Sequence, residues 1–246
     1  MNLNEHTALI TGGAIRLGKA IALELTRAGV RRTVVHYASS AGPAQETVQE
    51  IRALGGEAHA VQADLTNLEA TQSLLPRAAE AAGAPITLLV NSAALFLSGR
   101  LDATDADMWD AQMALNLRAP FLLSQRFARD LPADREGCIL NLLDTRIFRP
   151  GEDHLAYRLT KAALSDLTKN LAVALAPRIR VNAVAPGAVL PPPGEGIEHL
   201  MGVVRERVPL QRPGSAEAVA KAARYLAESE FLTGVIIPVD GGEALV

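Results

Sequence analysis

Short apolar runs alternate with helical patterns along the chain, and this alternation constrains the fold more than any other feature of the sequence. The runs are rich in β-branched and aliphatic residues and have the length of strands. The segments between them carry apolar residues at intervals of three and four positions, which is typical of helices that bury one face. The predicted strands are residues 7–10, 33–37, 58–63, 86–90, 137–143, 179–184 and 234–239, and the predicted helices are 15–29, 43–54, 68–82, 106–131, 154–176, 195–207 and 216–228.

This pattern predicts an α/β fold, because parallel strands need crossover connections and helices usually provide them. We expect a single doubly wound, Rossmann-type parallel sheet of seven strands with helices on both faces, formed by residues 1–246 as one domain. Hydrophobic residues make up 49% of the chain and aromatic residues 4%, which indicates an aliphatic core. Ligands of such sheets bind beyond the carboxyl ends of the strands. The residues that follow predicted strands at this edge include Gly12, Asp64, Asn91, Asp144 and Pro186.

The charge distribution and the single cysteine argue against several classes of protein. The net charge is -3 and the basic residues are scattered, unlike a nucleic-acid footprint or a polybasic membrane anchor. Cys138 has no second cysteine to pair with, so we expect a reduced, cytoplasmic protein. No apolar stretch reaches the ~20 residues of a membrane helix, and no signal peptide or metal-ligand spacing is evident. The expected partner is a small-molecule substrate, with no nucleic acid, membrane or metal.

A glycine turn follows the first predicted strand. The sequence Thr11-Gly12-Gly13 separates this strand from the helix predicted at 15–29. Backbone N–H groups and the helix dipole favour a phosphate at such a turn, and glycine lets a pyrophosphate approach the backbone. An ordinary strand–helix turn has the same local sequence. Because further strand–helix units follow, we interpret this turn as part of a dinucleotide site.

The residues after the second predicted strand bear on which dinucleotide binds. Sites for NAD place an Asp or Glu there to accept a hydrogen bond from the ribose 2′-OH. Here the sequence is HYASS at residues 36–40, with no acid. A carboxylate would repel a 2′-phosphate, so its absence permits NADP, and Ser39, Ser40 and Arg16 could donate hydrogen bonds to a phosphate. We predict NADPH as the cofactor.

Tyr157 and Lys161 lie four positions apart in the helix predicted at 154–176 and therefore share one face of it. A cation within a few ångströms favours the phenolate, which lowers the pKa of a tyrosine from ~10 towards the working pH. Proton transfer is efficient when the two values are close. The same spacing occurs by chance in many helices, so its interpretation depends on the rest of the chain.

Several short motifs occur in the order and spacing of one family. They are Thr11-Gly12-x-x-x-Arg16-x-Gly18, Asp64-Leu65, Asn91-Ser92-Ala93, Asn116, Tyr157-x-x-x-Lys161, Pro186-Gly187 and Asp240-Gly241-Gly242. With them the chain resembles the short-chain dehydrogenase/reductase family over its whole length. The resemblance implies hydride transfer from a nicotinamide, with Tyr157 as the proton donor, Lys161 on the nicotinamide ribose and Asn116 holding a relay water. The cofactor-binding residues that it implies are Gly12, Arg16, Leu17, Gly18, His36, Tyr37, Ser39, Ser40, Asp64, Leu65, Asn91, Ser92, Ala93, Lys161, Pro186 and Gly187.

Two positions resemble the pteridine reductase branch of this family. The family's glycine motif usually has glycine where this chain has Arg16, and its usual catalytic serine, thirteen residues before the tyrosine, is Asp144 here. His36-Tyr37, Phe96 and residues 208–212 also resemble that branch, which implies a substrate pocket formed by Arg16, Phe96, Asp144 and Tyr157. Two sites differ from the branch. Ala94 replaces a serine near the pterin, and residues 38–40 lack the basic residue that holds the 2′-phosphate.

Asp144 favours a pteridine on chemical grounds as well. An ionised carboxylate opposes the negative charge that develops on a carbonyl oxygen, whereas the ring nitrogen of a C=N bond must gain a proton. We therefore expect NADPH-dependent reduction of a biopterin, dihydropterin or dihydrofolate, with Asp144, Tyr157, Lys161 and Asn116 as catalytic residues. Two alternatives stay open: a carbonyl reductase acting on a 3-oxoacyl thioester or related ketone, and a non-catalytic NADP-binding regulatory protein.

Two further expectations rest on the resemblance. The proline-rich residues 190–194 begin a segment, 190–210, that lies where members of the family carry a substrate lid. The helices that contain Asn116 and Tyr157 are too apolar to face solvent on all but one side. In the family such helices pair subunits, so we expect a homotetramer.

Overall fold

The seven strands form one parallel sheet in the order β3-β2-β1-β4-β5-β6-β7, which confirms the predicted fold class. The computed structural model describes residues 2–192 and 194–246, so Pro193 of the predicted lid lies outside the described residues. The strands are β1 Thr7–Ile10, β2 Arg32–Tyr37, β3 Glu57–Gln62, β4 Leu88–Asn91, β5 Gly137–Leu142, β6 Ile179–Pro186 and β7 Ile236–Val239.

The strand order reverses between β1 and β4, because the chain builds β1, β2 and β3 in one direction and β4 to β7 in the other. Such a reversal opens a crevice at the carboxyl edge of the sheet. The register brings the strand ends together there, with Ile10 beside both Val35 and Val90 and Asn91 beside Asn141. The residues that follow these strands therefore meet at one edge.

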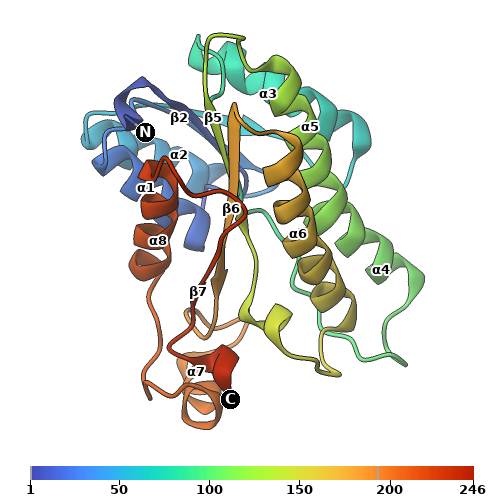
Figure 1. Ribbon diagram of the computed structural model, residues 1–246. Coiled ribbons are helices and arrows are strands. Elements are labelled where there is room, and N and C mark those ends of the chain that lie inside the picture. The colour runs from blue at the N-terminus through green and yellow to red at the C-terminus, as the bar shows by residue number, and fades with distance from the viewer. Residues whose placement is uncertain (1, 193) are drawn as a thin grey trace.

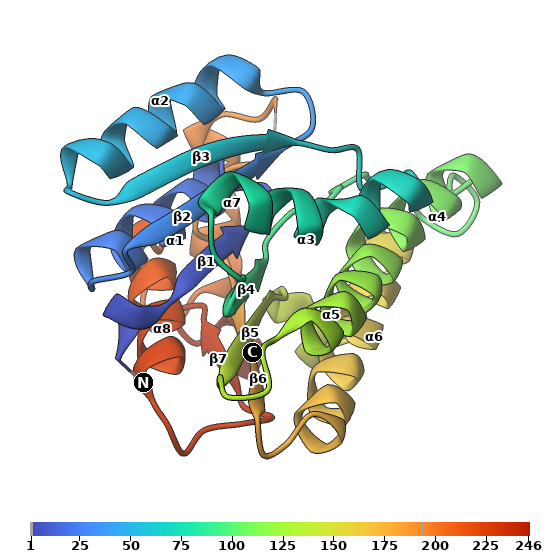
Figure 2. The ribbon, with the colours of Figure 1, turned by 90° about the horizontal axis from the view of Figure 1, so that it is seen from above.

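Helices cover both faces of the sheet (Figures 1 and 2). Alternate strand residues point to opposite faces, so Ile10 packs in one core and Leu9 in the other. The first core contains side chains of α1 (Arg16–Arg27), α2 (Ala41–Ala53) and α8 (Ala216–Glu228). The second contains side chains of α3 (Leu68–Ala82), α5 (Ala119–Asp130) and α6 (Leu155–Ala174). Both cores are predominantly aliphatic, as the composition indicates.

The helix predicted over 106–131 is in fact interrupted. It consists of α4 (Ala106–Met113), a π-helical turn (Ala114–Arg118) and α5. Pro120 has no N–H to donate to the carbonyl of Asn116, so the regular α-helical ladder cannot continue through this point. Single π-helical turns of this kind are frequent at functional sites. The interruption places Asn116 in the turn itself.

The remaining elements lie at the carboxyl edge. Figure 1 shows α7 (Ile197–Arg207) and the C-terminal turn η4 (Glu243–Leu245) together below the sheet, at the ends of β6 and β7. The last strand starts at Ile236, two residues later than predicted, and Gly234 before it has a left-handed φ of +75°, which a strand does not accommodate. Among the described residues, no helix has the length and apolar character needed to cross a membrane.

Candidate active site

The glycine turn after β1 is so closely packed against neighbouring backbone that side chains at its glycines would clash. A Cβ added to Gly12, whose φ is +63°, would lie 3.0 Å from the Cα of Ala93, and one added to Gly18 would lie 2.2 Å from the carbonyl oxygen of Gly12. Ile15, the N-cap residue of α1, offers no side-chain acceptor to the first turn of the helix. The N–H groups of residues 16–18 are therefore suited to hold an anion such as a pyrophosphate.

His36 supports this turn with its ring and its backbone carbonyl group. Its Nδ1 accepts a hydrogen bond from the Gly12 N–H (3.1 Å), so its Nε2 carries the proton and donates to the carbonyl oxygen of Ala63 (2.9 Å). Burial lowers the pKa of His36 to about 4, which keeps the ring neutral and Nδ1 free to accept. The Gly13 N–H donates to the His36 carbonyl oxygen (3.0 Å). Both polar atoms of the His36 ring are thus used within the protein, in a supporting role that the sequence did not indicate.

The predicted adenosine residues lie at the ends of β2 and β3. Ser39 is exposed, and the hydroxyl of Ser40 makes no capping bond at the start of α2. Asp64 accepts hydrogen bonds from the N–H and the hydroxyl of Thr66 (2.9 and 2.7 Å), and these bonds lower the pKa of its carboxyl. Leu65 is buried and Tyr37 partly buried. No acid follows β2, as the sequence showed.

The end of β4 is fastened to the end of β1. The Thr11 hydroxyl accepts hydrogen bonds from the N–H groups of Ser92 and Ala93 (2.9 and 3.0 Å). Asn91 donates from its side chain to Asn141 on β5 (2.8 Å), and its Oδ1 is buried without a hydrogen-bond partner. The predicted cofactor segment 91–93 therefore lies at the crevice between β1 and β4.

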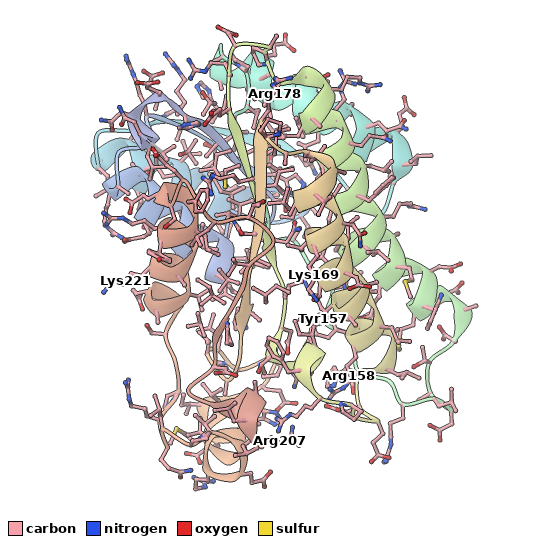
Figure 3. All side chains as sticks on the ribbon, viewed as in Figure 1. Tyr157, Arg158, Lys169, Arg178, Arg207 and Lys221 are labelled. Carbon is pink, nitrogen blue, oxygen red and sulfur yellow. The ribbon has the colours of Figure 1, made fainter. Side chains whose placement is uncertain are left out.

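Asp144 and Tyr157 converge as the sequence predicted. The Tyr157 hydroxyl, from α6, donates to Oδ2 of Asp144 at 3.0 Å. Asp144 follows β5 and begins a short 3₁₀ helix, Thr145–Phe148, by accepting the Arg146 N–H (2.8 Å). The Arg146 guanidinium pairs with the same carboxylate at 3.2 Å. Figure 3 shows Tyr157 near the lower end of α6, above α7 with Arg207.

The pKa of Tyr157 moves in the direction opposite to the predicted one. Burial, and after it the charge and hydrogen bond of Asp144, hold the pKa of the phenol well above its usual value. The Lys161 Nζ lies 5.7 Å from the ring centroid and donates to the Leu142 carbonyl oxygen (2.6 Å). Burial lowers the pKa of Lys161 itself to about 8. The Tyr157 phenol therefore stays protonated and donates its hydrogen bond to Asp144. Of these two residues, Lys161 has the lower pKa, at about 8.

Phe96 packs beside the Asp144–Tyr157 pair. Its ring stacks on His154 (4.2 Å between centroids, 15° between planes) and meets Tyr157 edge-on (4.7 Å, 86°). The Arg146 guanidinium lies 5.1 Å from the same ring. The sequence did not indicate roles for His154 and Arg146 in this stack. The sequence offers one signal for them, which is proximity to the catalytic candidates: Arg146 lies two residues after Asp144, and His154 lies three residues before Tyr157.

Asn116 fixes the segment that carries Phe96. Its side-chain oxygen accepts the Leu95 N–H (2.8 Å), while its nitrogen donates to the Leu95 carbonyl oxygen (2.9 Å) and to the Thr160 hydroxyl (3.3 Å). These bonds occupy both ends of the amide. The side chain thus positions the segment that carries Phe96, and any contact with a relay water has to use the remaining lone pair of its oxygen or the backbone.

Arg16 joins the glycine turn to the segment after β6. It has a left-handed φ of +54°, and its guanidinium donates to the carbonyl oxygen of Pro191 (2.7 Å) in the predicted lid segment. This bond connects the glycine turn to Pro191 of the predicted lid segment. On the opposite side, Pro186 ends β6, and Gly187 follows it against the C-terminal turn.

The comparisons with known proteins agree with this geometry. A family model described as enoyl-(acyl carrier protein) reductase matches residues 13–243. A 3-oxoacyl-[acyl-carrier-protein] reductase from Synechocystis is 33% identical over 98% of this chain and 97% of its own. The chain belongs to the short-chain dehydrogenase/reductase family.

Solved structures of similar proteins add the cofactor. The FolM alternative dihydrofolate reductase 1 from Brucella canis, complexed with NADP, matches with a TM-score of 0.92 and 36% identity, covering 100% of this chain and 97% of its own. A short-chain dehydrogenase from Burkholderia cenocepacia, also in complex with NADP, matches with a TM-score of 0.90 and 35% identity, and 99% of each chain is covered. The NADPH cofactor predicted from the sequence agrees with these NADP complexes, and the N–H groups at the uncapped start of α1 fit the pyrophosphate of such a group.

Proposed function

We propose that this protein is an NADPH-dependent reductase of a pteridine, such as a dihydropterin or dihydrofolate. The observation that carries the proposal is the 3.0 Å hydrogen bond between Tyr157 and Asp144. Bound NADPH supplies the hydride. Tyr157 holds a proton that a reduced ring nitrogen can take, and Asp144, held by Arg146, orients the phenol. Lys161, with a pKa of about 8, is placed behind the phenol to stabilise the charge left on its oxygen.

The carboxylate of Asp144 distinguishes a C=N bond from a ketone. A reduced carbonyl carries negative charge on oxygen, and a carboxylate within hydrogen-bond distance of the proton donor opposes that charge. A basic ring nitrogen can take up a proton before the hydride is transferred, so no such anion develops on it. Phe96, stacked on His154 beside Tyr157, adds an aromatic surface next to the proton donor, which suits a flat heterocycle. The similarity to the Brucella FolM protein supports the same substrate class.

NADPH rather than NADH is proposed on the residues after β2. No carboxylate there can accept a hydrogen bond from the ribose 2′-OH, and the hydroxyls of Ser39 and Ser40, which follow β2, are the donors proposed for a 2′-phosphate. Arg16 is available from the glycine turn, although in this structure it bonds to Pro191. We propose that this bond also holds the lid, residues 190–210, across the substrate.

A second candidate is reduction of a 3-oxoacyl thioester. The 33% identity to the Synechocystis 3-oxoacyl-[acyl-carrier-protein] reductase favours it, and Tyr157 and Lys161 would serve a ketone equally well. The two candidates are separated by an NADPH-oxidation assay with biopterin, dihydrobiopterin, dihydrofolate and acetoacetyl thioester measured side by side. We expect turnover of at least one pteridine at a kcat/KM well above that of the thioester. Preference for the thioester would reject the pteridine proposal.

We also propose that a second copy of the chain covers the outer faces of α4, α5 and α6, as part of a homotetramer. These helices border a groove of about 1040 Å³ whose lining includes Ala111, Leu117, Phe121 and Leu167. Phe121 is 42% exposed, which is costly for a large apolar side chain without a partner. Light scattering coupled to size-exclusion chromatography tests the assembly. The cytoplasmic location expected from the single Cys138 stays a prediction.

A further inference from the structure

The C-terminal turn places a buried acid between two loops of the active site. Glu243 begins η4, and its side chain is only 4% exposed. Its Oε1 accepts a hydrogen bond from the Nη2 of Arg149 at 2.9 Å, and its Oε2 accepts the backbone N–H of Ala188 at 3.1 Å. Each oxygen of one carboxylate is therefore bonded to a different loop.

The two loops carry opposite halves of the proposed reaction. Arg149 ends the segment that starts at Asp144, so it is continuous with the proton-donating side. Ala188 follows Pro186 and Gly187 at the end of β6, which is the proposed cofactor side. The contact is close, because a Cβ added to Gly187 would lie 2.7 Å from Oε2 of Glu243.

Asp240, three residues earlier, fastens the same turn. Its Oδ2 accepts hydrogen bonds from the Thr145 hydroxyl (2.9 Å) and the Ala244 N–H (2.8 Å), and its Oδ1 accepts the Gly242 N–H (2.9 Å). Thr145 and Arg149 of the Asp144 segment thus hold the C-terminal residues at Asp240, at Glu243 and at the carbonyl oxygen of Val246, to which Arg149 also donates (2.6 Å). Of the two acids, Glu243 is the one that also accepts a hydrogen bond from the loop after β6, at the Ala188 N–H, among the bonds of the described residues.

We propose that Glu243 is a positioning residue that sets the separation between the Asp144–Arg149 segment and the Pro186–Ala188 segment. A buried carboxylate is stable only while its partners remain in place, so both loops are held to the geometry that satisfies it. The inference rests on the proposed oxidoreductase function but not on the identity of the substrate. A shift of about 1 Å between reacting groups costs about 100-fold in rate.

The first test follows the loops themselves, without substrate. Glu243→Gln preserves the shape, but an amide can satisfy only one of the two donors, because its nitrogen is itself a donor. We expect hydrogen–deuterium exchange of the purified protein to accelerate at least threefold in peptides covering 144–149, in those covering 186–190, or in both. The control is Glu57→Gln, which removes a carboxylate paired with Arg31 and Arg32 at the amino end of β3 and should leave both segments unchanged. Exchange in Glu243→Gln that matches the wild type in both segments would overturn the proposal.

The second test separates positioning from loss of folded protein. With NADPH deuterated at the transferred position of C4, the isotope effect on kcat should rise in Glu243→Gln as kcat falls about tenfold or more. A variant that only contains less folded enzyme loses kcat without a change in the isotope effect, and that result would contradict the proposal. Arg149→Lys keeps the charge but loses the fork, and should give the same rise if Glu243→Gln does not fold.

The substrate used is whichever one the wild type reduces. Turnover of the thioester alone would reject the pteridine assignment while leaving the Glu243 test intact. Pteridine turnover with an unchanged isotope effect in Glu243→Gln would support the pteridine assignment and reject the role of Glu243. If the wild type reduces none of the four substrates, the exchange experiment alone decides the role of Glu243.

Discussion

Two regions at the carboxyl edge of the sheet differ in how their polar side chains are bonded. Around the glycine turn after β1, neutral side chains bond mainly to backbone groups. Around Tyr157, mostly charged side chains bond to one another. On the β1–β3 side, Thr11 and His36 each join a loop to a neighbouring strand end. On the β5–β7 side, Asp144 pairs with Arg146, and Glu243 pairs with Arg149, whose guanidinium also donates to the carbonyl oxygen of Val246. The first region shapes a backbone surface, and the second concentrates charge where protons move.

This difference explains why the two regions should respond differently to substitution. A backbone cradle depends on close approach and on neutral acceptors, so its loss should appear in stability and cofactor affinity. A charged cluster depends on which groups are protonated, so its loss should appear in rate and pH dependence.

The largest expected effect is that of Tyr157→Phe. The substitution removes the only phenolic proton on Asp144 and keeps the ring packed against Phe96. We expect kcat to fall about 1000-fold, within the range for general acid catalysis, while the Kd for NADPH changes less than threefold. Stopped-flow reduction and fluorescence titration measure the two quantities. A variant that retains more than a tenth of wild-type kcat would show that the proton comes from elsewhere.

His36 should affect stability instead of rate. Its pKa of about 4 in the folded protein lies below the unfolded value near 6.5, so the unfolded state binds a proton first as the pH falls. The stabilisation present above pH 6.5 is lost between pH 6.5 and 4, by at most about 3 kcal/mol. We expect urea unfolding of His36→Asn, whose amide can accept the Gly12 N–H without titrating, to show a shallower pH dependence. His6, whose pKa burial also lowers to about 4, stays in both proteins and serves as the internal control. Identical pH slopes would contradict the role of His36.

The pH–rate profile should report Lys161. Because burial and Asp144 raise the pKa of Tyr157, the descending limb of kcat/KM belongs to the ammonium, whose pKa is lowered to about 8. Activity should fall about tenfold per pH unit above that value. In Lys161→Arg, where the guanidinium stays charged, the limb should move above pH 10 even if the maximal rate is lower. A limb that stays at the same pH would assign it to another group.

The smallest effect is expected from adding a cation on the neutral side. Ser39→Arg places a guanidinium near the proposed 2′-phosphate, and a charge-assisted bond should tighten NADPH about tenfold. The affinity for NADH, which lacks that phosphate, should not change. Isothermal titration of both dinucleotides measures this, with Ser39→Ala as the matched neutral control. Equal gains for both dinucleotides would mean that the 2′-phosphate lies elsewhere.

Much of the fold was predictable because it depends on local patterns. Alternating strands and helices imply a parallel sheet, and residues that follow strands must meet at its carboxyl edge. The proximity of Asp144 and Tyr157 was predictable for the same reason, because Asp144 follows β5 and Tyr157 lies in the first turn of α6. The π-helical turn at Asn116 could not be predicted from the helical pattern. It combines the missing N–H of Pro120 with hydrogen bonds from the Asn116 side chain to Leu95, a residue distant in sequence.

The electrostatics were not predictable from spacing. Lys161 is on the expected face of α6, but the direction of the Tyr157 pKa depends on burial and on a carboxylate at hydrogen-bond distance. His36 accepts a hydrogen bond from Gly12 only because the fold brings the glycine turn next to the end of β2. Glu243 reaches the cleft from the far end of the chain, and contacts between such distant segments leave no periodic signal in the sequence.

The central claim is that the carboxyl–phenol pair directs the proton to nitrogen, and Asp144→Ser tests it most directly. The measurement is the ratio of kcat/KM for dihydrobiopterin to kcat/KM for acetoacetyl thioester, with the Kd for NADPH determined on the same preparations. We predict that the ratio falls about 100-fold or more in the variant while the Kd changes less than threefold. A variant that keeps the wild-type ratio would contradict the account.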